Sequence, residues 1–113
     1  MGDSILLSIK KLLGIGDDYK YFDEDIIMHI NSVFMILNQL GIGPEAGFSI
    51  SDESTTWSDF TEDINMLEAL RTYVYMRVRL MFDPPSSSFV LTSFENQYKE
   101  LEWRLNVMVD PKS

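Results

Sequence analysis

The spacing of apolar residues predicts four amphipathic helices, over about residues 4–13, 23–40, 59–82 and 87–109. In the second range, apolar residues recur every three or four positions and so share one helix face: Ile26, Ile30, Val33, Leu37 and Leu40. The last range repeats this spacing at Phe94, Tyr98, Leu101, Leu105 and Met108. We therefore expect an all-α fold, a bundle of three long helices and a short N-terminal one, in a single domain over 1–113.

The range 59–82 is the most apolar of the four. Its main stripe consists of Ile64, Leu67, Leu70, Val74, Val78 and Met81, and it is widened by Met66, Tyr73 and Leu80. A helix this apolar is expected at the centre of the bundle or against another subunit. Arg71, Arg77 and Arg79 interrupt it, and in so acidic a chain they favour ion pairs within or between subunits over phosphate binding.

Residues that start and stop helices flank these ranges. Asp3 is a candidate N-cap of the first helix, and Gly14 and Gly41 are candidate stops of the first and second. Pro111 is expected to end the last helix, because a residue before proline avoids helical geometry. The stretch 83–88, Asp-Pro-Pro-Ser-Ser-Ser, predicts a stiff corner in which a serine caps the following helix.

The segment 41–60 has a different composition, with clustered glycines and then an acidic run rich in Ser and Thr that ends at Trp57. The alternation at residues 48–51 permits a short strand or β-hairpin. A connection of this length exceeds the usual loop, so we expect the segment to pack against a neighbouring chain or to be mobile in isolation. Candidate interface residues come from here, from the arginines and from the aromatic residues: Phe48, Ile50, Trp57, Arg77, Arg79 and Trp103.

Charge is the strongest compositional signal. The net charge is −9, and residues 1–70 hold 13 acidic and 3 basic side chains, whereas residues 71–113 are close to neutral. Proteins that read DNA gain most of their affinity from Lys and Arg, so such a role is disfavoured. The absence of cysteine excludes disulfides and fits a reducing compartment. No apolar stretch is long enough for a membrane span, and the order of apolar and basic residues at the start differs from a secretory signal.

Candidate catalytic and metal-binding patterns are weak. His29 is the single histidine, and the acidic residues at 17–25 lack the ligand spacing of a calcium loop. Ser86 to Ser88 have no nucleophile motif, and the glycines at 14 and 16 are not followed by the rest of a phosphate-binding loop. We therefore expect no enzyme, no catalytic residue, no metal and no cofactor.

Two stretches carry a family resemblance. The sequence over 70–89, with Phe-Asp-Pro-Pro at 82–85, and the sequence over 90–106, with Glu-Leu-Glu-Trp-Arg-Leu-Asn at its end, resemble head-tail connector proteins of tailed bacteriophages and prophages. These proteins are often called head-completion or DNA-packaging proteins. The start of the chain, an apolar helix followed by an acidic linker, also resembles the family. The resemblance covers about 1–40 and 64–110.

This resemblance implies a structural protein of the virion, at the head-tail junction, assembled in the bacterial host cytoplasm. Subunits of such proteins form a ring, commonly of twelve, beneath the portal protein of the filled head, and a tail or stopper protein docks on that ring. DNA passes through the channel without sequence-specific binding. An acidic channel would repel phosphates and let DNA slide, so we expect the carboxylates of residues 1–70 to line it.

A second function class remains open. A small cytoplasmic helical module that regulates another protein through an exposed helix would also fit an acidic all-α chain without catalytic motifs. The order of neighbouring genes separates the two hypotheses, because portal and capsid genes upstream and tail genes downstream support the connector.

Overall fold

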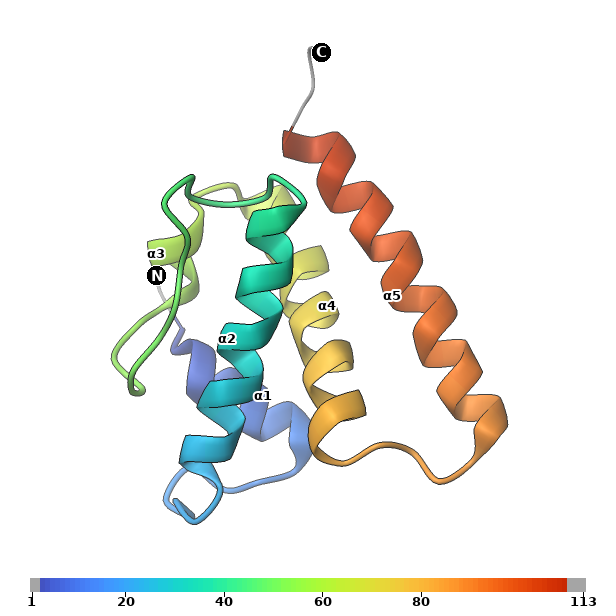
Figure 1. The fold of residues 1–113 in the computed structure, drawn as a ribbon. Coiled ribbons are helices and arrows are strands. Elements are labelled where there is room, and N and C mark those ends of the chain that lie inside the picture. The colour runs from blue at the N-terminus through green and yellow to red at the C-terminus, as the bar shows by residue number, and fades with distance from the viewer. Residues whose placement is uncertain (1–2, 110–113) are drawn as a thin grey trace.

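The computed structural model describes residues 3–109, which form five helices (Figure 1). They are α1 (Ile5–Leu13), α2 (Asp23–Gln39), α3 (Trp57–Phe60), α4 (Ile64–Phe82) and α5 (Ser88–Val109). The prediction of an all-α bundle with three long helices and a short N-terminal one is confirmed. Within residues 3–109 no β-strand forms, and the hairpin that residues 48–51 permitted is replaced by extended loop; one isolated β-bridge joins Ser4 and Thr56. The predicted stop at Pro111 lies outside the described residues.

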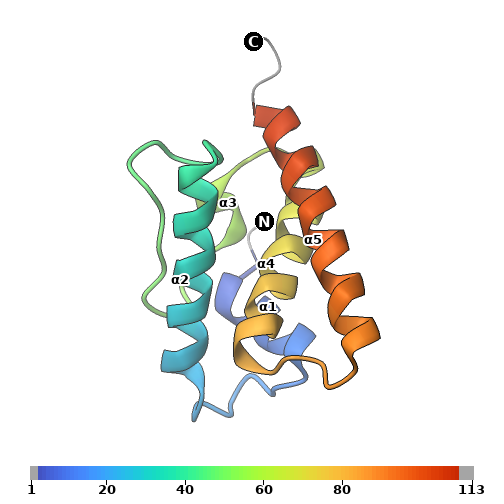
Figure 2. The ribbon, with the colours of Figure 1, turned by 45° about the vertical axis from the view of Figure 1, so that its right-hand side comes forward.

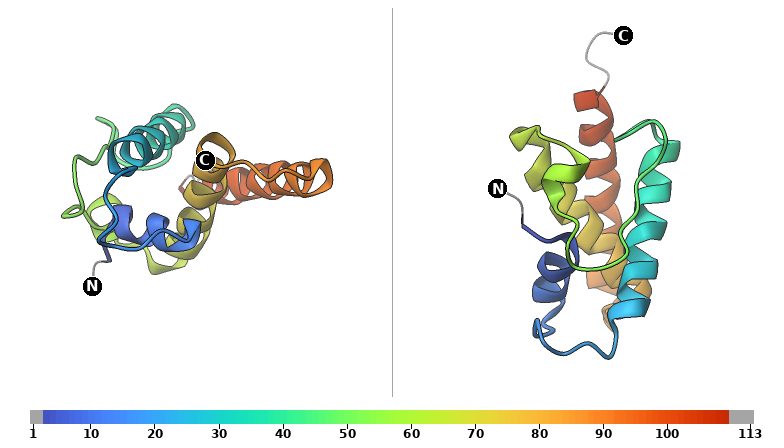
Figure 3. Two further views of the ribbon diagram at one scale, coloured as in Figure 1. Left: turned by 90° about the horizontal axis from the view of Figure 1, so that it is seen from below. Right: turned by 90° about the vertical axis from the view of Figure 1, so that its left-hand side faces the viewer.

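α4 occupies the centre of the bundle, as its apolar sequence predicted. Figures 1 and 2 show α4 between α2 and α5, and α1 packs against both α2 and α4. One side of α5 packs against α4. Seen from below, it projects away from the other helices (Figure 3).

Local hydrogen bonds explain where α1 and α2 begin and end. The side chain of Ser4, not the predicted Asp3, caps α1 by accepting a hydrogen bond from the backbone N–H of Leu7. Gly14 then ends α1 with a φ of 83°, in the left-handed region that glycine adopts without strain. After α2, Gly41 has a φ of 81° and the N–H of Ile42 bonds the carbonyl of Leu37, which closes the helix in a Schellman arrangement.

The predicted helix over 59–82 is two helices, so its start was wrong. Thr56 and Asp59 form a capping box that fixes the single turn of α3. Thr61 is extended, with φ −154° and ψ 149°, and the side chain of Asp63 accepts a hydrogen bond from the N–H of Asn65 to begin α4. These side chains offer the backbone local partners that compete with a continuous helix.

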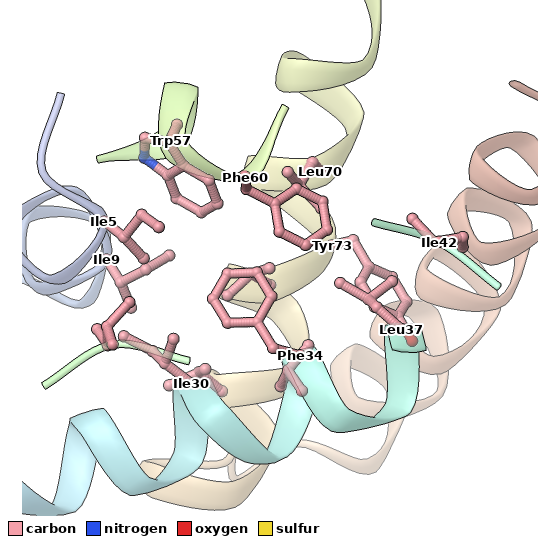
Figure 4. Close-up of a cluster of buried hydrophobic side chains, with 14 of the residues drawn as sticks. Ile5, Ile9, Ile30, Phe34, Leu37, Ile42, Trp57, Phe60, Leu70 and Tyr73 are labelled. Carbon is pink, nitrogen blue, oxygen red and sulfur yellow. The ribbon is translucent and has the colours of Figure 1, made fainter. Parts of the chain in front are cut away.

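The core joins the helices to the 41–60 segment (Figure 4). Phe60 stacks on Phe34 of α2 with ring centroids 5.1 Å apart, and the indole of Trp57 donates a hydrogen bond to Ser8 of α1 at 3.0 Å. Asn31 of α2 pairs with both backbone groups of Ile50, at 2.8 and 3.0 Å. The long connection therefore packs on its own chain.

The predicted apolar stripe of α4 is correct in its middle and wrong at its ends. Leu70, Tyr73 and Val74 are fully buried, as predicted. Ile64 is 76% exposed and Met81 is 42% exposed, because these residues lie at the two ends of α4, beyond the helices that cover its middle.

Candidate subunit interface

Three predicted interface residues contact their own chain. Ile50 and Trp57 are buried in the core, and the ring of Phe48 packs edge-on against Phe34 and Phe60 at 4.9 and 5.1 Å. Their apolar surface stabilises the fold in the isolated chain. A contact between these residues and a partner stays a prediction.

Arg77 and Arg79 connect α4 to α5 and to the corner between them. The guanidinium of Arg77 donates to Glu102 at 3.1 Å and lies 4.4 Å from the ring centroid of Tyr98. Arg79 donates to the carbonyl of Asp83 at 2.6 Å, which helps to hold the corner at the end of α4. The ion pair between Arg77 and Glu102 lies within the chain, one of the two kinds of ion pair that the sequence favoured over phosphate binding.

Glu102 is the polar centre of the contact between α4 and α5. It accepts hydrogen bonds from the Tyr73 hydroxyl at 2.6 Å and from Arg77 through the same carboxylate oxygen. Burial, and then the hydrogen bond to Glu102, raise the pKa of Tyr73 above its ordinary value, so the phenol stays protonated and can donate. These bonds fix how α5 is rotated against α4.

That rotation turns a second apolar row of α5 away from the bundle. Tyr98, Leu101 and Leu105 pack against the core. Phe89 and Trp103 lie on the opposite side and are 82% and 67% exposed. We call the surface formed by Phe89, Ser93, Asn96, Lys99, Glu100, Trp103 and Val107 the outer face of α5. Trp103 is the predicted interface residue that the structure leaves exposed.

The outer face of α5 is hollowed in its middle. An open hollow of about 320 Å³ lies over the helix. Its lining residues are Phe89, Thr92, Ser93, Asn96, Gln97 and Glu100. Since Ser93 and Asn96 are small beside Phe89 and Trp103, the face presents large side chains at its ends and space between them.

A comparable exposed row on α2 was missed by the sequence reasoning. Met28 and Met35 are 58% and 62% exposed on the side of α2 opposite its buried stripe, and Tyr21, just before the helix, is 79% exposed. The signal was available as a spacing of seven from Tyr21 to Met28 to Met35. We call these three residues, with Glu24, Asp25 and Ser32, the outer face of α2.

The two outer faces lie in parts of the chain with different charge. Residues 21–70 contain ten Asp and Glu and no Lys or Arg. Within this acidic region Ser54 donates two hydrogen bonds to Asp52, which lower the pKa of that carboxyl. On α5, Lys99 has no carboxylate within ion-pair distance among residues 3–109, and Arg104 pairs only with Glu100, one turn away on the surface.

Acidic residues near position 20 have a structural use that the sequence did not reveal. Lys10 of α1 is fully buried, its Nζ lies 2.8 Å from Asp23, and it donates hydrogen bonds to the carbonyls of Asp17 and Tyr19 at 3.2 and 2.9 Å. Lys10 thus holds the linker between α1 and α2 against the bundle.

The predicted serine cap of the last helix is present. Ser87 accepts a hydrogen bond from the N–H of Val90 at 3.4 Å at the start of α5.

His29 is half-buried, 6.3 Å from the ring of Phe82. In the part of the chain from 3 to 109, no cluster of three or more His, Cys, Asp or Glu is arranged to hold a metal ion. No helix in that part is both long and apolar enough to cross a membrane.

Comparison with protein-family models identifies a family for this chain. A model described as a phage connector protein matches residues 5–112, nearly the whole chain. Comparisons with curated proteins and with solved structures gave no significant match.

Proposed function

Since the chain belongs to the phage connector protein family, we propose that it is a non-enzymatic head-tail connector that forms a ring adaptor between the portal of the DNA-filled head and the tail. The family match over residues 5–112 carries this proposal. The whole chain acts as one connector domain. Twelve copies make the assembled ring, in keeping with the resemblance.

The surface of the chain suits this role. A ring requires a heterologous contact, in which two different patches of each subunit meet and rotation closes the circle. Exposed apolar residues on α2 and on α5 supply two such patches, whereas the core residues of the 41–60 segment stabilise the subunit itself. The same chain therefore has both a closed core and surface left for neighbours.

The charge distribution suits a channel for DNA. The region 21–70 has ten acidic and no basic side chains, so a channel wall built from it would repel phosphates instead of binding them. Asp52, Glu53 and Asp59 are exposed there. A ring reconstruction that places these carboxylates on its outer surface would overturn the acidic channel and leave the connector role intact.

The proposed partners are other virion proteins: the portal above the ring, and a tail or stopper protein below it. The site of action is the head-tail junction of the virion, reached during assembly in the bacterial host cytoplasm. DNA crosses the ring without sequence-specific contacts.

Electron microscopy of portal particles tests the proposal. Portal from the same phage or prophage is imaged by negative stain with and without the purified chain. An added ring of density on one side of the portal is expected, and portal images identical with and without the chain would contradict the connector role. As a genetic counterpart, disrupting the gene should leave DNA-filled heads and separate tails.

A further inference from the structure

The outer faces of α2 and α5 are complementary to each other. We propose that they form the contact between neighbouring copies of this chain, with α5 of one copy lying antiparallel along α2 of the next. The proposal rests on the proposed ring and names the surfaces that would build it. Its first support is that both faces carry exposed apolar residues that the fold itself does not use.

The residues along the middle of the two faces have the same spacing. Met28 and Met35 are seven residues apart, as are Phe89 and Asn96, and Asn96 and Trp103. Seven residues of helix rise by about 10.5 Å, so the rows repeat at the same distance along their axes. Side chains of one helix can then enter the spaces of the other along the whole contact.

Charge selects the antiparallel direction. Asp25 lies in the acidic first turn of α2, and Lys99 lies in the second half of α5 without an ion-pair partner among residues 3–109. When Asp25 is set opposite Lys99 in antiparallel helices, Met35 falls opposite Phe89, and Glu24 falls opposite Glu100, which already pairs with Arg104 at 2.9 Å. A parallel arrangement with the starts of the two helices level would instead place the acidic turn beside residues 88–94, which carry no charge.

The hollow on α5 accommodates the same register. In this alignment Met28 falls opposite Asn96, which lines the hollow of about 320 Å³. Tyr21 falls opposite Trp103, so an aromatic pair closes that end of the contact. Methionine is an unbranched, adaptable side chain that fills irregular spaces, and Met28 is therefore suited to the hollow.

The contact joins two different faces and so propagates from copy to copy. Pairing α2 with α2 in parallel would bring two acidic first turns together, which like-charge repulsion disfavours, and an antiparallel α2–α2 pair would stop at a dimer. Pairing α5 with α5 would bury Phe89 and Trp103 but would stop at a dimer. Only the α2–α5 contact of these three predicts that each copy can be joined to two neighbours.

Cysteine cross-linking tests the contact, because the natural chain has no cysteine. The double variant Met35→Cys/Phe89→Cys, mildly oxidised in the presence of portal, is expected to give a ladder of disulfide-linked dimers, trimers and larger species. Equal amounts of the two single variants should give dimers only, and each single variant alone should give monomers. Opposed Cα atoms must approach within about 7 Å for this bond, which makes the assay specific for the register.

The control double variant Met35→Cys/Ile64→Cys places its second thiol on exposed Ile64 of α4, outside both faces. An equally strong ladder from this control would overturn the proposal, and so would dimers from Phe89→Cys alone, which would indicate an α5–α5 pair. Circular dichroism is used to check that the variants keep the helical fold.

Microscopy separates this contact from the connector role. If rings of the unaltered chain form on the portal but the double variant in those rings gives no ladder, the contact is wrong and the connector role stands. If the unaltered chain adds no ring while the double variant still forms the ladder, the contact stands and the connector role is wrong.

Discussion

Lys10 shows how one buried cation can organise a linker. Its ammonium lies beside Asp23, whose side chain is 19% exposed, and it satisfies two linker carbonyls. We expect Lys10→Met to lower the free energy of unfolding by about 3 kcal/mol, because it leaves a partly buried carboxylate and two carbonyls without their partner. Urea unfolding at pH 7 measures the change.

The neighbouring Lys11 is the matched control, since it is exposed on the same helix. Lys11→Met should change the free energy of unfolding by no more than about 0.5 kcal/mol. Equal losses in the two variants would show that net charge, and not the buried contact, stabilises the linker.

Alanine substitutions at two glycines after α2 distinguish the cost of backbone strain from the cost of a steric clash. Gly41 and Gly43 both have positive φ, 81° and 94°, but a Cβ on Gly43 would lie 2.4 Å from the ring of Phe60, whereas a Cβ on Gly41 meets no atom within 4 Å. Phe60 cannot move freely because Phe34 and Phe48 pack against it. Gly43→Ala should therefore cost about 1–3 kcal/mol more than Gly41→Ala in thermal or urea unfolding. Similar costs for both would mean that the ring yields.

At the scale of elements, the position of α5 depends on Glu102. Replacing Glu102 by Ala leaves the Tyr73 hydroxyl and the Arg77 guanidinium without their shared partner. We expect a loss of about 2 kcal/mol in unfolding free energy, with faster amide hydrogen exchange in α5 than in α2.

Glu100→Ala provides the comparison on the same helix. Glu100 pairs with Arg104 one turn away, and their side chains are 61% and 57% exposed, so water already screens the pair. The expected cost is below about 0.5 kcal/mol. If both variants lost equal stability, α5 would be held by its apolar contacts alone.

Periodicity predicted the helices well where each had one buried side. α2 begins at Asp23, as predicted, and α5 begins one residue later than predicted. Periodicity failed between Phe60 and Ile64, because these residues have helical spacing although residues 61–63 between them are not helical. The capping side chains decide that break, and their choice depends on local hydrogen bonds that apolar spacing does not report.

The candidate interface was only partly predictable for a related reason. Aromatic composition marked both Trp57 and Trp103, but it could not tell which one the fold would bury. Burial of Trp57 requires α1, which supplies Ser8 from 49 residues away in the sequence. The exposed row on α2 went unnoticed because Met28 and Met35 interrupt a polar face that by itself looks solvated.

At the scale of the whole molecule, we expect one tryptophan to be needed for folding and the other for assembly. Trp57 is 1% exposed and Trp103 is 67% exposed. Trp57→Ala should cost about 3–5 kcal/mol, because it removes a core side chain that touches α1 and α4. Trp103→Ala should cost less than about 1 kcal/mol, since most of the side chain already contacts water.

Assembly should respond in the reverse order. The comparison is made at a temperature where both variants are folded. With Trp103→Ala, fewer portal particles are expected to carry an added ring than with the unaltered chain, because Trp103 lies on the outer face of α5. Trp57→Ala, while folded, keeps both outer faces and should add rings normally. Ring counts by microscopy, set beside the urea midpoints, distinguish the roles. If Trp103→Ala is as stable as the unaltered chain and adds rings equally well, the outer face of α5 is not part of the subunit contact. If it is equally stable but adds no rings, Trp103 is needed for assembly and not for folding.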